Sequence, residues 1–128
     1  MRKLKTVLAA CAVVLGLAGC STAPAKYNAS QPLGKQLNYT ITGIDAGAGV
    51  MSRTTVALKK YGLSAHNWQL QTSSTAAMTS TLGKAVEHHQ PIVVTGWQPH
   101  WMFDKYDLKF LKDPKHAYGT SEAIHTIA

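Results

Sequence analysis

Cysteine and acidic residues are both scarce in this chain of 128 residues. It has 2 cysteines, too few for a disulfide-dense scaffold, and 6 acidic against 13 basic residues, which gives a formal net charge of +7. Its leading apolar stretch, residues 6–17, is too short to span a bilayer comfortably. The composition, 45% hydrophobic and 8% aromatic, excludes a disordered tail and a collagen-like fibre. We therefore expect one compact domain at most.

The first twenty residues indicate export rather than structure. Residues 1–5 are basic, residues 6–17 are apolar, and residues 17–20 are Leu-Ala-Gly-Cys. This tetrapeptide resembles the bacterial lipobox, which implies that the Cys20 thiol receives diacylglycerol and that the chain is cut just before it. The alternative is a plain signal peptide followed by an incidental cysteine. We expect residues 1–19 to be a lipoprotein signal peptide, and a diacyl group to anchor the mature chain on the extracytoplasmic face of the cell membrane.

The positive charge is too mild and too scattered to indicate a nucleic-acid partner. Three of the 13 basic residues leave with the signal peptide, which lowers the net charge from +7 to +4. Between residues 104 and 115 four lysines are interleaved with three aspartates, as on a solvated face. We expect no nucleic acid to bind.

Residues 20–38 offer little to bury. From Ser21 to about Gln36 the chain is mostly Ser, Thr, Ala, Pro, Lys, Asn, Gln and Gly. This composition predicts a flexible tether between the acylated Cys20 and the folded part, residues 39–128.

Three segments of the folded part have the pattern of strands. β-Branched residues predict one strand at 39–44, a second short strand is expected at 68–71, and a continuous Ile/Val run predicts a third at 91–95. The third pattern is typical of a parallel strand that is buried on both faces. Because helical patterns separate the strands, we expect an α/β lobe with a mainly parallel sheet and flanking helices.

Two segments have helical spacing. The first, residues 50–61, is followed by Gly62 in the position of a C′ residue, and the second follows a cluster of candidate N-caps at 72–75. The expected apolar face of the first helix comprises Met51, Thr54 or Thr55, Leu58 and Tyr61. That of the second comprises Met78, Leu82, Ala85 and Val86.

Two loops leave the sheet at the carboxyl ends of its strands, where ligands bind in open parallel sheets. The loop at 45–49 offers main-chain N–H groups at the positive end of a helix, which suits an anion. The loop at 96–101 offers the aromatic faces of Trp97 and Trp101, which suit a quaternary ammonium ion. Together they fit a small zwitterion. The alternatives are a tight strand–helix connection without a ligand and, for the tryptophans, packing in the core; we expect one of the two to be core.

For four other polar residues we weigh a structural role against a role in binding a ligand or a metal. His88 and His89 are adjacent, so on a helix they point about 100° apart, and no third ligand is spaced to join them on a metal. We expect them to form a polar helix end, and we expect no metal and no cofactor. His100 either lines the cleft or orients its own turn by hydrogen bonding. The Asp45 carboxylate is expected to accept N–H groups of its glycine turn.

Four ordered motifs match a known family. They are Gly-Ile-Asp-Ala-Gly-Ala-Gly-Val-Met at 43–51, Ser-Thr-Ala-Ala-Met-Thr at 74–79, Val-Thr-Gly-Trp-Gln-Pro-His-Trp-Met-Phe at 94–103 and Ile-His-Thr-Ile-Ala at 124–128. From about Tyr39 onward the chain resembles the glycine betaine substrate-binding lipoproteins of osmoprotectant ABC importers. The resemblance implies one lobe of a type II periplasmic-binding-protein fold, which closes on glycine betaine or a related quaternary amine, docks on an ABC permease and catalyses no reaction.

The resemblance also assigns ligand-binding positions. It implies that the main-chain N–H groups of Gly49 and Val50 hold the betaine carboxylate, and that Trp97 is one side of an aromatic box around the trimethylammonium group. Val50 stands where relatives often have Ile, which matters little for a main-chain donor. Ala46 stands where many have Pro, which we expect to loosen the turn.

Two alternatives to a binding protein remain at this point. One is an α/β enzyme that binds phosphate at its glycine turn, although residues 47–49 continue to Ser52 without the third glycine of a dinucleotide fingerprint, and a P-loop is absent. The other is a truncated remnant that binds nothing, because a lobe cut within a strand has an unpaired edge.

The resemblance predicts that these 128 residues alone bind glycine betaine weakly or not measurably. In the family the opposite lobe supplies further tryptophans and a histidine, and the absence of one aromatic interaction, worth about 1 kcal/mol, lowers affinity several-fold. Titration calorimetry of the acyl-free chain with glycine betaine measures this directly. A dissociation constant in the micromolar range would contradict the prediction.

Overall fold

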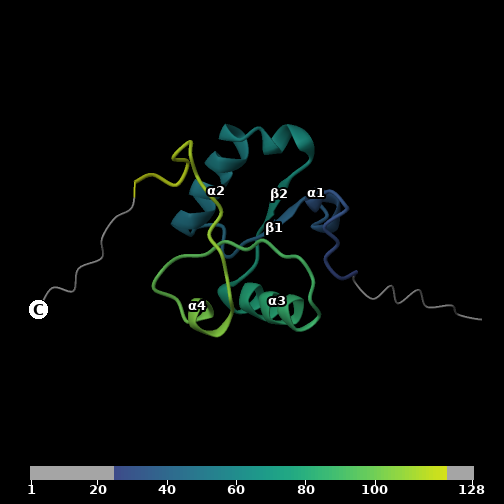
Figure 1. Cartoon of the computed structure of the whole chain (residues 1–128). Helices are drawn as coiled ribbons and strands as arrows, with labels where there is room; N and C mark the ends of the chain where they lie inside the picture. The colour runs from purple at the N-terminus through teal and green to yellow at the C-terminus, as the bar shows by residue number, and fades with distance from the viewer. Residues whose placement is uncertain (1–24, 121–128) are drawn as a thin grey trace, which may run out of the picture.

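The structure of this chain, a computed structural model, describes residues 25–120. Its elements are, in order, α1 (Leu33–Gln36), β1 (Thr40–Thr42), α2 (Gly49–Lys60), the 3-10 helix η1 (Leu63–His66), β2 (Gln69–Gln71), α3 (Thr75–Glu87) and α4 (Met102–Lys105). Figure 1 shows α2 on one side of the strands and α3 with α4 on the other. The expected signal peptide and Cys20 lie outside the described residues. Within residues 25–120, none of the helices has the length and apolar character needed to cross a bilayer.

Parallel pairing centres on β1. Strand β2 pairs with it in parallel, with Ile41 opposite Leu70. On its other edge β1 makes a single parallel bridge, Thr42 to Val94. Two hydrogen bonds of 2.9 Å flank that bridge, from the Thr42 amide to the Val93 carbonyl and from the Thr95 amide to the Thr42 carbonyl. The parallel order of the three segments is therefore confirmed.

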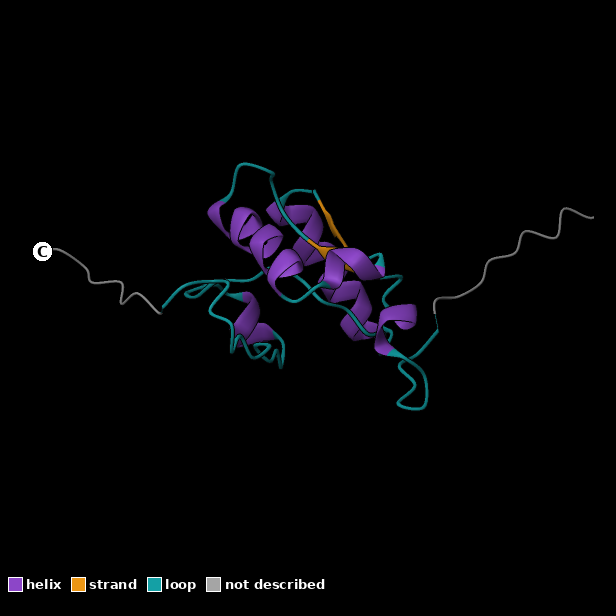
Figure 2. Ribbon diagram, turned by 90° about the horizontal axis from the view of Figure 1, so that it is seen from above, coloured by secondary structure: helices purple, strands orange, loops and turns teal. Residues whose placement is uncertain are grey.

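The expected third strand, at 91–95, is shorter than predicted, because only its bridge at Val94 is paired among the described residues. Pro91, the first residue of the expected strand, has no N–H to donate. Two of its apolar side chains, Ile92 and Val94, still pack on the core. Figure 2 shows that helices make up most of the regular structure and strands only a small part.

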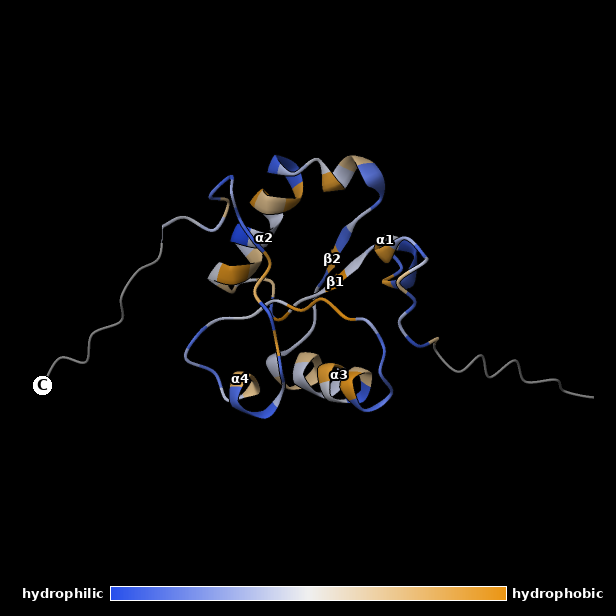
Figure 3. Ribbon diagram, viewed as in Figure 1, coloured by the Kyte–Doolittle hydropathy of each residue, from blue (hydrophilic) through white to orange (hydrophobic). Residues whose placement is uncertain are grey.

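The core lies where α2, α3 and α4 meet the strand ends. We call it the core cluster; its members are Ile44, Met51, Met78, Leu82 and Met102. Three of these, Met78, Leu82 and Met102, have no exposed surface. Ile92 and Val94 pack against it from the third segment. In Figure 3 that apolar segment runs through the middle of the molecule, between α2 and α3.

Local signals at the helix ends are confirmed. Gly62 has a φ of +67°, the left-handed conformation expected of a residue that follows a helix. The Ser74 hydroxyl accepts the Ala77 amide at 3.1 Å and caps α3. Val86 was expected to face inward but is 42% exposed, because it follows the buried Ala85 by one position and so points about 100° away.

Ordered structure also extends into the segment expected to be a tether. Helix α1 forms there, and the Gln36 side chain ties it to the preceding turn. Its amide oxygen accepts the Asn28 amide at 2.7 Å, and its amide nitrogen donates to the carbonyls of Asn28 and Gln31 at 2.8 and 2.9 Å. One side chain thus satisfies three backbone groups, which composition alone does not predict.

Residues 113–118 form a strap against α2. The Asp113 carboxylate accepts the amides of Ala117 and Tyr118 at 3.0 and 2.9 Å, and it accepts the Tyr61 hydroxyl at 2.5 Å. The Tyr118 amide, the Tyr61 hydroxyl and the Ala117 amide together lower the pKa of Asp113 from 3.8 to about 2. All of these donors favour the charged carboxylate.

We expect acid to loosen the strap. Because the pKa of Asp113 is lower in the folded state, its contribution to stability is fully present above about pH 4 and is lost as the pH falls toward about 2. Urea unfolding followed by circular dichroism across this range should show a falling free energy of unfolding. Asp113→Asn should give a flatter profile; parallel profiles for the two proteins would contradict the assignment.

Candidate functional site

The turn between β1 and α2 leaves two main-chain donors free. The Ala48 amide donates to the Asp45 main-chain carbonyl at 3.0 Å, which closes the turn, and α2 then begins at Gly49. Among residues 25–120, the amides of Gly49 and Val50 have no acceptor, as geometry requires at a helix start. The turn was expected to be held by the Asp45 carboxylate; the main-chain carbonyl closes it instead.

The space beside this helix start is open. A Cβ built on Gly47 or Gly49 would meet nothing within 4 Å, and Gly49 is exposed. The first turn of α2 has no acidic residue and Ala48 supplies no side-chain cap, so the positive end of the helix dipole is not neutralised locally. Such a helix start suits an anion.

A close approach fixes the backbone of this turn. A Cβ on Gly43 would lie 2.5 Å from the Met51 sulfur and 2.7 Å from the Gln71 carbonyl oxygen, so only glycine fits. The Ile44 amide donates to the Met51 sulfur at 3.3 Å. Ser73 binds from the other side, its hydroxyl donating to the Gly43 carbonyl at 2.5 Å. These supporting residues were not predicted; the one available signal was a glycine directly after a strand.

Trp97 packs against the same core cluster as Val50. It is partly buried, and its ring forms a T-shaped pair with the His100 ring, with centroids 4.7 Å apart and planes at 79°. His100 in turn accepts the Met102 amide through Nδ1 at 3.2 Å, so it orients its own turn, which was one of its two expected roles. The structure therefore brings the start of α2 and Trp97 to one cluster.

Trp101 lies in a different environment. It is 51% exposed, and the Lys105 ammonium lies 5.7 Å from its ring centroid, so that a protein cation already covers this indole. The expectation that one of the two tryptophans packs on the core is confirmed, and that tryptophan is Trp97; it is only partly buried, so part of its surface stays accessible, whereas Trp101 lies outside the core.

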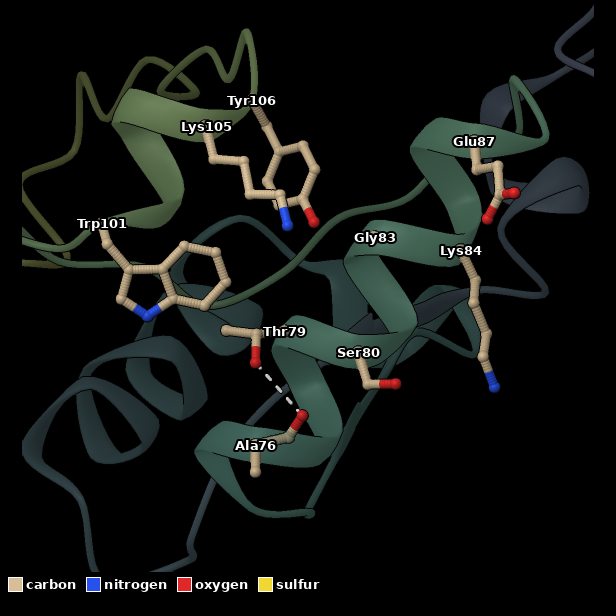
Figure 4. Close-up of a pocket in the computed structure, with 9 residues that line it drawn as sticks. All are labelled: Ala76, Thr79, Ser80, Gly83, Lys84, Glu87, Trp101, Lys105 and Tyr106. Atoms are coloured by element: carbon tan, nitrogen blue, oxygen red, sulfur yellow. Dashed lines mark hydrogen bonds between the residues drawn. The ribbon is translucent and has the colours of Figure 1, made fainter.

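Trp101 borders a groove of about 460 Å³ between α3 and α4 (Figure 4). Its lining residues are Ala76, Thr79, Ser80, Gly83, Lys84, Glu87, Trp101, Lys105 and Tyr106. Gly49, Val50 and Trp97 are not among them, so the groove is separate from the expected ligand site. In Figure 4 the side chains of Trp101 and Tyr106 face α3 across the groove.

The histidine pair lies at the end of α3. The helix ends at Glu87, His88 is its C-cap, and His89 has a φ of +54°. The His89 carbonyl accepts the Tyr27 amide at 3.2 Å. In the described part of the chain, no three His, Cys, Asp or Glu side chains lie together as a metal site requires.

Comparison with known families identifies the chain. The family of substrate-binding domains of ABC-type glycine betaine transport systems matches residues 23–128. The chain belongs to this family. The match includes both loops described above, the turn before α2 and the segment that carries Trp97.

Individual relatives agree with this family. The chain is 61% identical over 127 residues to the glycine betaine/carnitine transport binding protein GbuC of Listeria monocytogenes serotype 1/2a (strain 10403S), covering 99% of this chain and 42% of that protein. Lactococcal OpuAC, solved in a closed conformation with glycine betaine, is 55% identical with a TM-score of 0.62. The glycine/betaine/L-proline-binding protein ProX of Borrelia burgdorferi is 40% identical with a TM-score of 0.67.

These matches cover only part of each relative. OpuAC and ProX match 65% and 72% of this chain, and the matched parts are 32% and 34% of those proteins. The chain thus spans less than half the length of these relatives, 42% in the case of GbuC. The expected fold class, an α/β lobe of a periplasmic-binding-protein fold, is confirmed for the part that is present.

A substitution at Gly43 tests whether its close contact with Met51 and the Gln71 carbonyl holds the turn in place. Gly43→Ala should destabilise the fold by about 1–3 kcal/mol, because the Gln71 carbonyl belongs to the backbone and cannot move aside cheaply. Gly47→Ala is the matched control, since its Cβ meets nothing within 4 Å. Chemical denaturation measures both; equal stabilities would show that the approach is not a constraint.

Proposed function

We propose that this chain is the N-terminal part of an extracytoplasmic binding protein that captures glycine betaine, or a closely related quaternary amine, and delivers it to an ABC permease. The observation that carries the proposal is the pair of free amides at Gly49 and Val50, at a helix start where a Cβ on Gly47 or Gly49 would meet nothing within 4 Å. Family membership supports the choice of ligand. The protein acts by binding and release, without catalysis.

The two amides take the carboxylate. Both belong to the first turn of α2, where the helix dipole favours negative charge. A carboxylate has two oxygens, so one anion can accept from both donors. Hydrogen bonds to a charged group are each worth about 1.5–3 kcal/mol.

Trp97 takes the quaternary ammonium group. A fixed positive charge without N–H donors cannot be bound by hydrogen bonds, so an aromatic face is the suitable partner. The T-shaped contact with His100 restricts the orientation of the indole. Trp101 is a poorer candidate, because Lys105 already lies over its ring.

The N-terminal segment is proposed to attach the protein to the outer face of the cell membrane. Cys20 is the proposed site of lipidation, residues 1–19 are the proposed signal peptide, and residues 20–38 are proposed to link the anchor to the lobe. The order found around α1 shortens the flexible part of that link. The permease is the proposed partner in the membrane.

Gly49→Pro tests the amide site. Proline removes the N–H at the first helical position, where the helix itself offers no acceptor, and Ala48 has the extended backbone that proline requires before it. We expect glycine betaine binding to weaken roughly ten- to hundredfold. The measurement is a titration of the full chain carrying Cys20→Ser, followed by the amide shifts of Gly49 and Val50 in ¹H–¹⁵N spectra.

Gly49→Ala is the control, because it retains the amide and its Cβ meets no protein atom within 4 Å. Equal losses of affinity in the two variants would mean that shape, and not the amide, matters at this position. If neither amide of the unaltered site responds to glycine betaine, the chain is a remnant that does not bind.

A further inference from the structure

The strap at 113–118 reaches the helix start through a short relay of hydroxyl groups. The Thr54 hydroxyl donates to the Val50 carbonyl at 2.7 Å. The Thr54 oxygen also lies 2.8 Å from the Tyr118 hydroxyl oxygen. Val50 is proposed to bind the carboxylate through its N–H, so Tyr118, 64 positions after Thr54, is linked through one side chain to the carbonyl of a ligand-site residue.

Proton counting fixes the direction of this relay. A threonine hydroxyl has one hydrogen, and that of Thr54 is donated to the Val50 carbonyl. The hydrogen between Thr54 and Tyr118 must therefore come from Tyr118. The relay runs from Tyr118 to Thr54 to the Val50 carbonyl, and a phenylalanine in place of Tyr118 would remove its only outer donor.

The inner end of the relay is buried and its outer end is anchored. Thr54 is 1% exposed, so water cannot readily replace Tyr118 as its donor. The Arg53 guanidinium donates to the Tyr118 carbonyl at 2.7 Å, which holds the backbone of Tyr118 against α2. The strap and the first two turns of α2 are thus joined at two neighbouring helix residues.

The other end of the strap binds the far end of α2. The ammonium groups of Lys60 and Lys115 each donate to the other residue's carbonyl, at 3.3 and 2.8 Å, and the Tyr61 hydroxyl binds Asp113. These contacts lie at the C-terminal end of the helix, away from Gly49 and Val50. They provide a natural comparison, because they hold the same strap without reaching the ligand site.

We infer that Tyr118 is a positioning residue that, through Thr54, holds the first turn of α2 in the orientation in which its free amides bind a carboxylate. The inference rests on the proposed function of that site. Tyr118 follows α4 in the chain. It thereby sets the geometry of a binding site that is formed by residues before α4.

Tyr118→Phe tests the inference, with Tyr61→Phe as the matched control at the other end of the strap. In the full chain carrying Cys20→Ser, Tyr118→Phe should weaken glycine betaine binding roughly three- to tenfold, the effect of removing one hydrogen bond. Tyr61→Phe should leave it within about twofold. Choline has the same ammonium group but no carboxylate, so it should bind both variants as tightly as it binds the unaltered chain. The measurement in each case is the change in the amide shifts of Gly49 and Val50 and in the Trp97 indole shift.

Two further variants guard against a general loss of structure. Thr54→Val removes the relay and should match Tyr118→Phe, whereas Thr54→Ser retains the hydroxyl and should restore binding. Equal weakening for choline, or equal effects of Tyr118→Phe and Tyr61→Phe, would overturn the inference. If the unaltered site does not respond to glycine betaine at all, the proposed function fails first, and the inference with it.

Discussion

The packing of Met51 against Gly43 is the contact on which the site depends. It brings the first turn of α2 directly over the end of β1, where the Met51 sulfur accepts the Ile44 amide. A flexible thioether can fill the small space left by a glycine, and it still contributes to the core cluster. This contact holds the first turn of α2, whose amides at Gly49 and Val50 have no acceptor among the described residues, and a Cβ on Gly49 would meet nothing within 4 Å.

The two halves of the proposed site differ in how they are supported. The amides belong to the backbone, so their geometry follows from where α2 begins and how its first turn is held. Trp97 is a side chain, and its position follows from packing on the core cluster and from the contact with His100. A zwitterion needs both, which makes the common cluster beneath Val50 and Trp97 the feature that relates them.

Local features of the fold were predictable because their causes lie within a few residues. The end of α2 at Gly62 and the cap of α3 at Ser74 each depend on the conformation or the hydroxyl of one residue. The length of the third strand was not predictable, because its pairing depends on which backbone groups of β1 are available to it, and only Thr42 pairs with this segment, at Val94. The order around α1 was also missed, since it depends on Gln36 reaching back eight positions to Asn28.

The sequence by itself determined the alternation of strands and helices, the glycine turn before a helix start and the presence of two tryptophans in the loop after the third segment. Only the tertiary structure decided that Trp97 packs on the core cluster while Lys105 covers Trp101, and that Tyr118 returns to Thr54. The reason is physical. A periodic pattern reports which residues share a face of one element, whereas contacts between distant segments depend on how several elements pack together.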